Sequence, residues 1–397
     1  MADQTKFVDE GIAWLAANAP QDAGIADARV AGAKALAELG LPSKRVEAWK
    51  YTDLRRFLGA SNSNAKASCL TDAVSPQITL SKGGAMVGAL PSGVAHADRT
   101  DFAITDGLSA LRSGAATGSV ALTIEEGAAE PLHILNEGGA NAVAITVKKF
   151  ATLTLMESSV ADGLSQTLLS ITLEDGAKLR HVRLKDSPAD SADLTELSVT
   201  VGRDATYEQV SVILNAGQTR VTVDANLSAP GCHMRMNAAA LLDGQDHFDL
   251  SARTNHAIAH CDSHQLYKMV AADKAHGVMQ GLINVAEGAD DTDAHLLSKS
   301  LLLDATATIH QKPELTIFAD EVVCSHGATC GALDADALFY LRSRGIPERQ
   351  ARALLIAAFL DDVLLPLADW PDGERLAAIL REALQARFDA IVKGAGA

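Results

Sequence analysis

Runs of β-branched and aliphatic residues, each bounded by Gly, Asp or Asn, dominate the middle of the chain from about residue 142 to residue 318. The clearest runs are AVAITV (142–147), ATLTLM (151–156), TLLSITL (167–173), KLRHVRL (178–184), LTELSVTV (194–201), TRVTVDA (219–225) and PELTIFA (313–319). They recur roughly every dozen residues, which is typical of short β-strands. Because no long amphipathic helical pattern separates them, a βαβ sheet is disfavoured.

Three β architectures remain open, namely a sandwich, a barrel and a β-helix. The spacing follows no strict repeat motif, yet it is compatible with a solenoid whose coils stack their apolar faces into one continuous core. Periodicity alone does not choose among the three.

Helical spacing marks the N-terminal part of the chain up to about residue 60. The apolar positions that recur there are Phe7, Ile12, Leu15 and Ala16. An Ala-rich stretch then continues the pattern through RVEAWKYTDLRRFL (45–58). In it Trp49, Tyr51 and Leu54 lie among basic residues, which indicates a helix with one packed face and one solvated basic face.

The chain returns to helical patterns after Asp334. Pro347 and Glu348 suit the first turn of a helix that Pro366 closes. Its apolar stripe is Ala351, Leu354, Leu355, Ala358 and Phe359. A second stripe, with Asp372 as its N-cap, is Leu376, Ile379, Leu380, Ala383, Leu384, Phe388 and Ile391. Two C-terminal helices that pack on the body of the protein are therefore expected.

A stretch rich in Ser, Asn, Ala and Gly, from residue 61 to about residue 88, has little periodicity and is predicted to be a linker or loop. These patterns divide the chain into three regions. We expect an N-terminal helical region with its linker over residues 1–75, a β core over residues 76–335 and a C-terminal helical region over residues 336–397.

Acidic residues outnumber basic ones, 50 to 34, which gives a formal net charge of −16. A surface that follows nucleic-acid phosphates needs clustered cations, so no nucleic-acid partner is expected. The opening residues lack the basic and apolar segments of a secretory signal, and no apolar run is long enough to span a bilayer. We therefore expect a soluble, cytoplasmic protein with no membrane partner.

The five cysteines, an odd number scattered along the chain, fit reduced thiols better than a disulfide framework. Cys324 and His326 lie two residues apart in a predicted strand-to-loop segment that Gly327 loosens. On an extended backbone they share a face and could reach one ion or one partner surface. Each also fits an ordinary structural role. Cys330 is a third soft ligand, at a spacing typical of neither zinc knuckles nor ferredoxins.

His256, His260 and His264 recur every fourth residue, beside Cys261. On a helix they would share one face and could bind a metal. The surrounding sequence is not convincingly helical, however, and on a strand the three histidines would span about 26 Å, too far for one ion. A structural role for these residues is the competing interpretation.

No nucleotide-binding glycine loop and no serine-nucleophile elbow occurs in the sequence. Acidic pairs such as Asp290 and Asp291 are adjacent, so their side chains diverge, and a paired-carboxylate hydrolase is not indicated. We expect the chain not to hydrolyse ATP.

Three segments resemble the SufB/SufD family of iron–sulfur cluster assembly proteins. They are RVEAWKYTDLR (45–55), the segment from His256 through HCDSHQLYKMVAADKAHGVMQGLINV (256–285), and CSHGAT followed by LFYLRSRGI (324–346). The last segment is closer to the SufD type than to the SufB type. The resemblance implies a right-handed parallel β-helix flanked by helical regions. It also implies that His326, with Cys324, contributes to an iron or nascent-cluster site, with His256 and Cys261 as secondary candidates.

The resemblance further implies a non-catalytic scaffold that pairs with a SufB-like subunit and recruits a SufC-like ABC ATPase through its C-terminal helical end. No cofactor is expected to bind the isolated chain stably, and iron or a cluster would bind transiently with the partner. A homodimer is possible in isolation, because the edge strand of a β-helix can pair with a second copy. The expected partner-binding residues are Phe339, Tyr340, Arg342, Arg344, Leu355 and Phe359.

Two enzyme classes are the alternatives. A small zinc-dependent hydrolase would use His256, His260 and His264 and would hold one tightly bound zinc. A β-helix carbohydrate-active enzyme or acyltransferase would show a groove of clustered charges or a strict six-residue repeat, and the sequence has neither.

Overall fold

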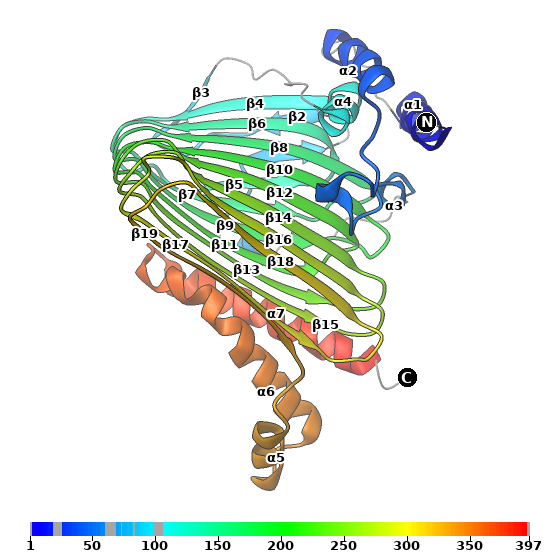
Figure 1. Ribbon diagram of the computed structural model, residues 1–397, viewed down its shortest axis with the longest axis vertical. Helices are drawn as coiled ribbons and strands as arrows, with labels where there is room; N and C mark the ends of the chain where they lie inside the picture. Colours follow the sequence, from blue (N-terminus) through cyan, green and yellow to red (C-terminus); the bar gives the residue numbers. More distant parts are fainter. Residues whose placement is uncertain are drawn as a thin grey trace.

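The computed structural model describes residues 2–18, 26–59, 69–72, 74–81, 84–97 and 106–394. Its body is built from two β-sheets (Figure 1). The strands are β1 (Ile78–Ser81), β2 (Gly84–Val87), β3 (Val94–His96), β4 (Ala116–Ile124), β5 (Leu132–Asn136), β6 (Gly139–Val147), β7 (Thr152–Ser159), β8 (Leu164–Leu173), β9 (Lys178–Asp186), β10 (Ala192–Val201), β11 (Thr206–Asn215), β12 (Gln218–Leu227), β13 (His233–Leu242), β14 (His247–His256), β15 (Asp262–Ala271), β16 (His276–Val285), β17 (Thr292–Leu302), β18 (Thr308–Ile317) and β19 (Val322–Gly331).

From β4 onward, successive strands alternate between the two sheets. Odd-numbered strands from β5 to β19 lie in a ten-stranded sheet, and even-numbered strands from β4 to β18 lie in a nine-stranded sheet. Each strand pairs in parallel with the strand two places along the chain, as β10 does with β12. This arrangement is a parallel β-solenoid, and the prediction of a mainly β, parallel β-helix core between helical regions is confirmed.

Alternating apolar residues fill the space between the sheets. Leu197 and Val199 of β10 lie in register with Val223 and Ala225 of β12, and all four belong to one continuous buried core. Stacking identical positions of successive coils excludes water from every inward side chain, which is how a solenoid builds its core. Some corners between strands use a left-handed residue, such as Asp204 with a φ of 53°, which Asp tolerates better than most residues.

A second core lies on the outer face of the ten-stranded sheet. Outward residues such as Val182 and Val210 pack there against C-terminal helices, which Figure 1 shows along that sheet. Both faces of these strands are therefore buried.

The C-terminal helices are α5 (Ala335–Ser343), α6 (Glu348–Asp361), the 3-10 helix η4 (Asp362–Asp369) and α7 (Gly373–Gly394). Asp334 caps α5 by accepting hydrogen bonds from the backbone N–H groups of Asp336 and Ala337. Pro366 does not close α6 directly, because the chain continues through it as η4. Among the residues that the structure covers, no helix is long and apolar enough to cross a bilayer.

The predicted stripe of α6 was partly wrong. The helix buries Ala351, Ala353, Ile356 and Leu360, whereas Leu354 is 45% exposed. An Ala- and Leu-rich helix has apolar residues on more than one face, so periodicity could not select the face that packs. In α7 the predicted stripe is correct in its main members, since the buried residues there include Leu376, Leu380, Leu384, Phe388 and Ile391.

The N-terminal prediction needs two corrections. Helices α1 (Ala2–Asn18) and α2 (Ala26–Leu39) form, but the RVEAWKYTDLRRFL stretch is not a continuous helix. It contains only the 3-10 turn η2 (Glu47–Trp49) and the short α3 (Arg55–Leu58), because its side chains bind the nine-stranded sheet. Secondly, the predicted linker contains the 3-10 turn η3 (Cys69–Asp72) and strands β1 and β2. Residues 61–68, 73, 82 and 83 of that linker lie outside the described ranges. One further helix, α4 (Gly107–Gly114), precedes β4.

Candidate interface and metal site

Among the residues that the structure describes, none forms a further coil on the last coil of the solenoid. Strands β18 and β19 each stand at the end of their sheet, so one edge of each strand offers unpaired backbone groups. Ile309, Leu315 and Val322 pack against the main core but are only partly buried. Phe318 and Val323 are each 64% exposed. The solenoid therefore ends in an open apolar layer with two free strand edges.

Cys324 and His326 lie in this last coil. Strand β19 runs without a break to Gly331, so the predicted strand-to-loop setting around Gly327 was wrong. Cys324 lies in register with Ala294 and His326 with Leu296, both of which are inward core residues. The two side chains consequently share the inward face, about 7 Å apart along the strand.

The two residues differ in environment. Cys324 is half-buried against the core, and burial raises the pKa of its thiol. It is therefore mostly protonated at neutral pH and must lose a proton to bind a metal. His326 is exposed at the open end. Cys330 is also exposed, but it lies about 20 Å along the strand from Cys324, too far to share one ion.

The secondary candidates lie elsewhere. His256 ends β14, is fully buried, and shares a 2.8 Å hydrogen bond with the Ser263 hydroxyl. Burial lowers its pKa to about 4. Cys261 is buried and donates to the Ala229 carbonyl at 3.2 Å. Both lie two coils before the last one, about 10 Å along the solenoid axis, so they do not join Cys324 and His326 in one site.

The three histidines of the four-residue pattern do not converge. His256 ends one strand, His260 lies in a corner beside Asp291, and His264 lies in β15. The His264 ring stacks on His295 instead, with ring centroids 5.2 Å apart. Within the described ranges, no group of three or more His, Cys, Asp and Glu side chains is placed to hold a metal.

The expected partner-binding residues lie on α5 and α6. Phe339 is 72% exposed and Tyr340 is 56% exposed. Arg342 is exposed near Glu348, and the Arg344 guanidinium lies 5.2 Å from the centre of the Tyr340 ring. These four residues form an aromatic and basic surface on α5.

Leu355 and Phe359 of α6 are only half-exposed. The Lys268 ammonium lies 4.7 Å from the centre of the Phe359 ring and covers part of it. A groove of about 560 Å³ runs between α6 and α7, with Leu354, Leu384 and Phe388 among its lining residues. The C-terminal region thus presents both a groove and a projecting aromatic surface.

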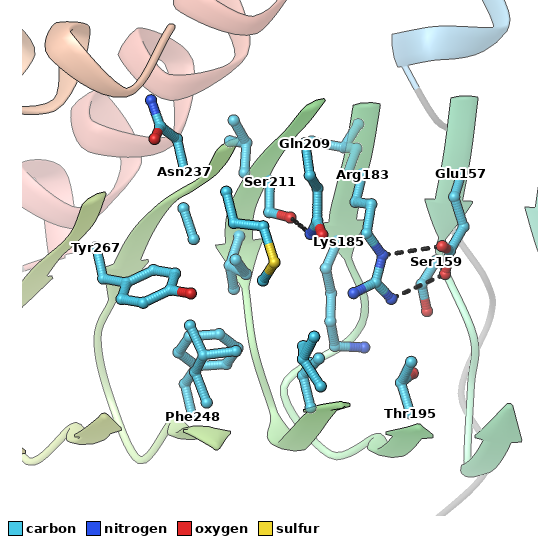
Figure 2. Close-up of a pocket in the computed structure, with 18 of the residues that line it drawn as sticks. Glu157, Ser159, Arg183, Lys185, Thr195, Gln209, Ser211, Asn237, Phe248 and Tyr267 are labelled. Atoms are coloured by element: carbon cyan, nitrogen blue, oxygen red, sulfur yellow. Dashed lines mark hydrogen bonds and ion pairs between the residues drawn. The ribbon is translucent and has the colours of Figure 1, made fainter. Parts of the chain in front are cut away.

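A charged network inside the solenoid escaped the sequence analysis. Figure 2 shows the Arg183 guanidinium directed at the Glu157 carboxylate of the neighbouring strand, and both residues line a small cavity of about 40 Å³. Burial would raise the pKa of Glu157, but Arg183 and His181 hold it well below its ordinary value. Lys185 binds Asp193 at 3.0 Å in the same space. The signal was present in KLRHVRLKD, where His181, Arg183 and Lys185 alternate and so share one strand face.

Comparison with known proteins shows which family the chain belongs to. Residues 133–359, more than half of the chain, match the family model described as "SUF system FeS cluster assembly, SufBD core domain". The chain belongs to the SufB/SufD family. The matched range contains most of the solenoid, Cys324 and His326, and helices α5 and α6 as far as Phe359.

Individual relatives support the same family. The iron–sulfur cluster assembly protein SufD of Escherichia coli is 34% identical over 200 residues, which cover 50% of this chain and 47% of that protein. A SufBD family protein of Synechocystis is 28% identical over 88% of this chain and 89% of its own length. One from Mycobacterium tuberculosis is 26% identical over 87% and 90%, respectively. The SufB/SufD resemblance is thereby confirmed for the chain. The matched range contains the second and third of the segments that carried it, whereas RVEAWKYTDLR (45–55) lies outside that range.

Proposed function

We propose that this chain is a SufD-type, non-catalytic scaffold subunit of an iron–sulfur cluster assembly complex, and that it pairs with a SufB-like subunit through the last coil of its solenoid. The observation that carries the proposal is the open apolar layer of β18 and β19 at the end of a chain of this family. The SufD name of the Escherichia coli relative supports the subunit type.

Pairing with a partner would use both the free strand edges and the exposed apolar side chains of the last coil. A partner strand along the free edge of β18 or β19 supplies hydrogen bonds to the unpaired backbone groups. The same contact covers the exposed side chains of Phe318 and Val323, which gains the free energy of apolar burial. A second copy of this chain offers the same edges, so a homodimer is the competing occupant when the SufB-like subunit is absent.

The cargo at this interface would be iron or a nascent cluster. An imidazole and a thiolate are suitable ligands for iron. His326 is exposed at the interface, and Cys324 lies two residues before it on the same strand face. Two ligands from this chain leave further positions for the partner subunit, so the site would be complete only when the two subunits pair.

The C-terminal region would recruit a SufC-like ATPase. Phe339 and Tyr340 expose aromatic rings next to Arg342 and Arg344, a combination enriched at protein interfaces. The groove between α6 and α7 would receive an apolar segment of the ATPase. ATP-dependent movement of that subunit would then be transmitted through α6 to the solenoid.

The zinc-hydrolase alternative has lost its supporting observation, since His256, His260 and His264 do not converge. The experiment that tests the proposal is affinity purification of the tagged chain from its own host, with bound proteins identified by mass spectrometry. Recovery of a SufB-like protein and an ABC-type ATPase is the expected result. Recovery of the chain alone, with stoichiometric zinc, would refute the proposal.

A further inference from the structure

The RVEAWKYTDLR motif lies across the outer face of the nine-stranded sheet. We call the segment from Glu47 to Phe57 the strap, and Figure 1 shows it on the side opposite the C-terminal helices. At its centre Trp49 is buried, and the Arg220 guanidinium of β12 lies 4.1 Å from the centre of its ring. Arg220 also donates a 2.8 Å hydrogen bond to the carbonyl of Ala48.

A chain of hydrogen bonds between polar side chains fixes the strap to β14. The buried Thr52 hydroxyl donates its one proton to the Asp249 carboxylate. Its oxygen must then accept from Nε2–H of His247, 3.0 Å away, which determines the tautomer of that ring. His247 Nδ1 is left as an acceptor, and it faces Nδ1 of His276 on β16 at 2.9 Å. Each hydrogen-bond donor in this chain of hydrogen bonds therefore has an acceptor.

Two residues of the strap, Glu47 and Tyr51, contact the edge strand β18. The Tyr51 ring stacks on His310 with ring centroids 4.6 Å apart. The Glu47 carboxylate accepts a 2.9 Å hydrogen bond from the Lys312 ammonium. His310 and Lys312 lie in the middle of β18, and no residue of that strand is fully buried. The strap therefore links internal coils, whose strands pair with a neighbour on each edge, to the last coil, whose strands pair on one edge only.

We propose that Glu47 and Tyr51 are positioning residues, which hold the edge strand β18 in the geometry that a SufB-like subunit pairs with. This inference rests on the proposed function, because it assigns a role to the strap in that pairing. A β-edge must be ordered before a partner strand can pair with it, and any disorder in the free chain lowers the affinity. The Tyr51 ring stack and the Glu47 ion pair attach β18 to the strap, which is itself bound to internal coils. They reduce that disorder without covering the free edge of β18.

The test uses the full-length double variant Glu47→Gln/Tyr51→Ala, with Val46→Ala as the matched control. Val46 precedes Glu47 directly and is 48% exposed. Amide hydrogen exchange of the isolated chain is measured over β18, with β10 as an internal reference. Binding to the SufB-like subunit is then measured by titration. The variant should exchange at least tenfold faster over β18 alone and should bind the subunit at least fivefold more weakly.

Lys312→Gln removes the same ion pair from the side of the strand, together with the 3.1 Å pair between Lys312 and Glu314. It should change the exchange rate over β18 and the affinity in the same direction as the double variant, by a smaller factor. Circular dichroism checks that each variant is folded. Unchanged exchange over β18 would overturn the proposal, and so would faster exchange with unchanged affinity. If the wild-type chain fails to bind the SufB-like subunit at all, the proposed function fails, while the exchange data still decide whether the strap holds β18.

Discussion

Arg183 holds Glu157 through two hydrogen bonds inside the solenoid, one from Nε at 2.8 Å and one from Nη2 at 3.0 Å. The two residues stand opposite one another on β9 and β7. His181 adds a contact with the same carboxylate at 3.3 Å. The pair is removed from solvent, so each charge is stabilised mainly by the other. Removing one of them should therefore lower the stability of the fold.

Glu157→Gln should lower the free energy of unfolding by about 3 to 5 kcal/mol, because it leaves the buried Arg183 charge without its partner. Urea unfolding at neutral pH measures the change. Asp175→Asn is the control, since it breaks the exposed 3.0 Å pair with Lys149, which solvent screens, and it should change the free energy of unfolding far less. Equal losses in the two variants would contradict the buried-pair interpretation.

Buried histidines make stability depend on pH. Burial lowers the pKa of His247 to about 3 and that of His256 to about 4, whereas an unfolded chain titrates near 6.5. Between these values the unfolded chain binds more protons, so stability is complete above about pH 6.5 and falls as the pH drops toward 4. His247 alone should cost about 2 kcal/mol at pH 5 relative to pH 8.

The measurement is urea unfolding at both pH values for the wild type, His247→Asn and His256→Gln. Each substitution should reduce the loss of stability between pH 8 and pH 5. A loss that is unchanged in both variants would show that other groups cause the acid sensitivity.

His326→Ala should reduce iron–sulfur cluster assembly in cells at least tenfold, because it removes an exposed ligand of the last coil. The readout is the activity of a cluster-dependent reporter enzyme in a strain that relies on this chain. The control is His264→Ala, which removes a histidine of the outer sheet surface that stacks on His295. Wild-type assembly in the His326 variant would exclude the ligand role.

Phe339→Ser with Tyr340→Ser should weaken binding of the SufC-like ATPase at least tenfold, and should leave the free energy of unfolding within about 0.5 kcal/mol because both side chains are exposed. Calorimetric titration with the purified ATPase measures the affinity. Leu365→Ser is the matched control, because Leu365 is 59% exposed on η4, away from α5. An equal loss in the control would mean that the α5 surface has no specific role.

Strands β6 to β10, β12 and β18 could be predicted from the sequence, because their runs of β-branched and aliphatic residues are regularly bounded. Strands β1 and β2 could not. Each has four residues in a segment rich in Gly and Ser, and β1 is stabilised by β5, more than fifty residues away. Pairing between distant segments leaves little trace in a local pattern.

The candidate site was predicted in part. The spacing of Cys324 and His326 predicted correctly that their side chains share one face of a strand. It could not show that this strand lies in the last coil, where its edge is free, because that depends on how many coils stack. The strap shows the same limit. Trp49 and Tyr51 suggested a helix, yet their partners Arg220 and His310 lie far along the chain. Contacts of that kind override local helical preference.

The central claim is that the last coil pairs with a SufB-like subunit. Amide hydrogen exchange of the chain, alone and with that subunit, tests it most directly. Slower exchange over β18 and β19 in the complex, with β6 and β8 unchanged, is the result that this account predicts. Slower exchange confined to other elements, with the last coil unaffected, would contradict it.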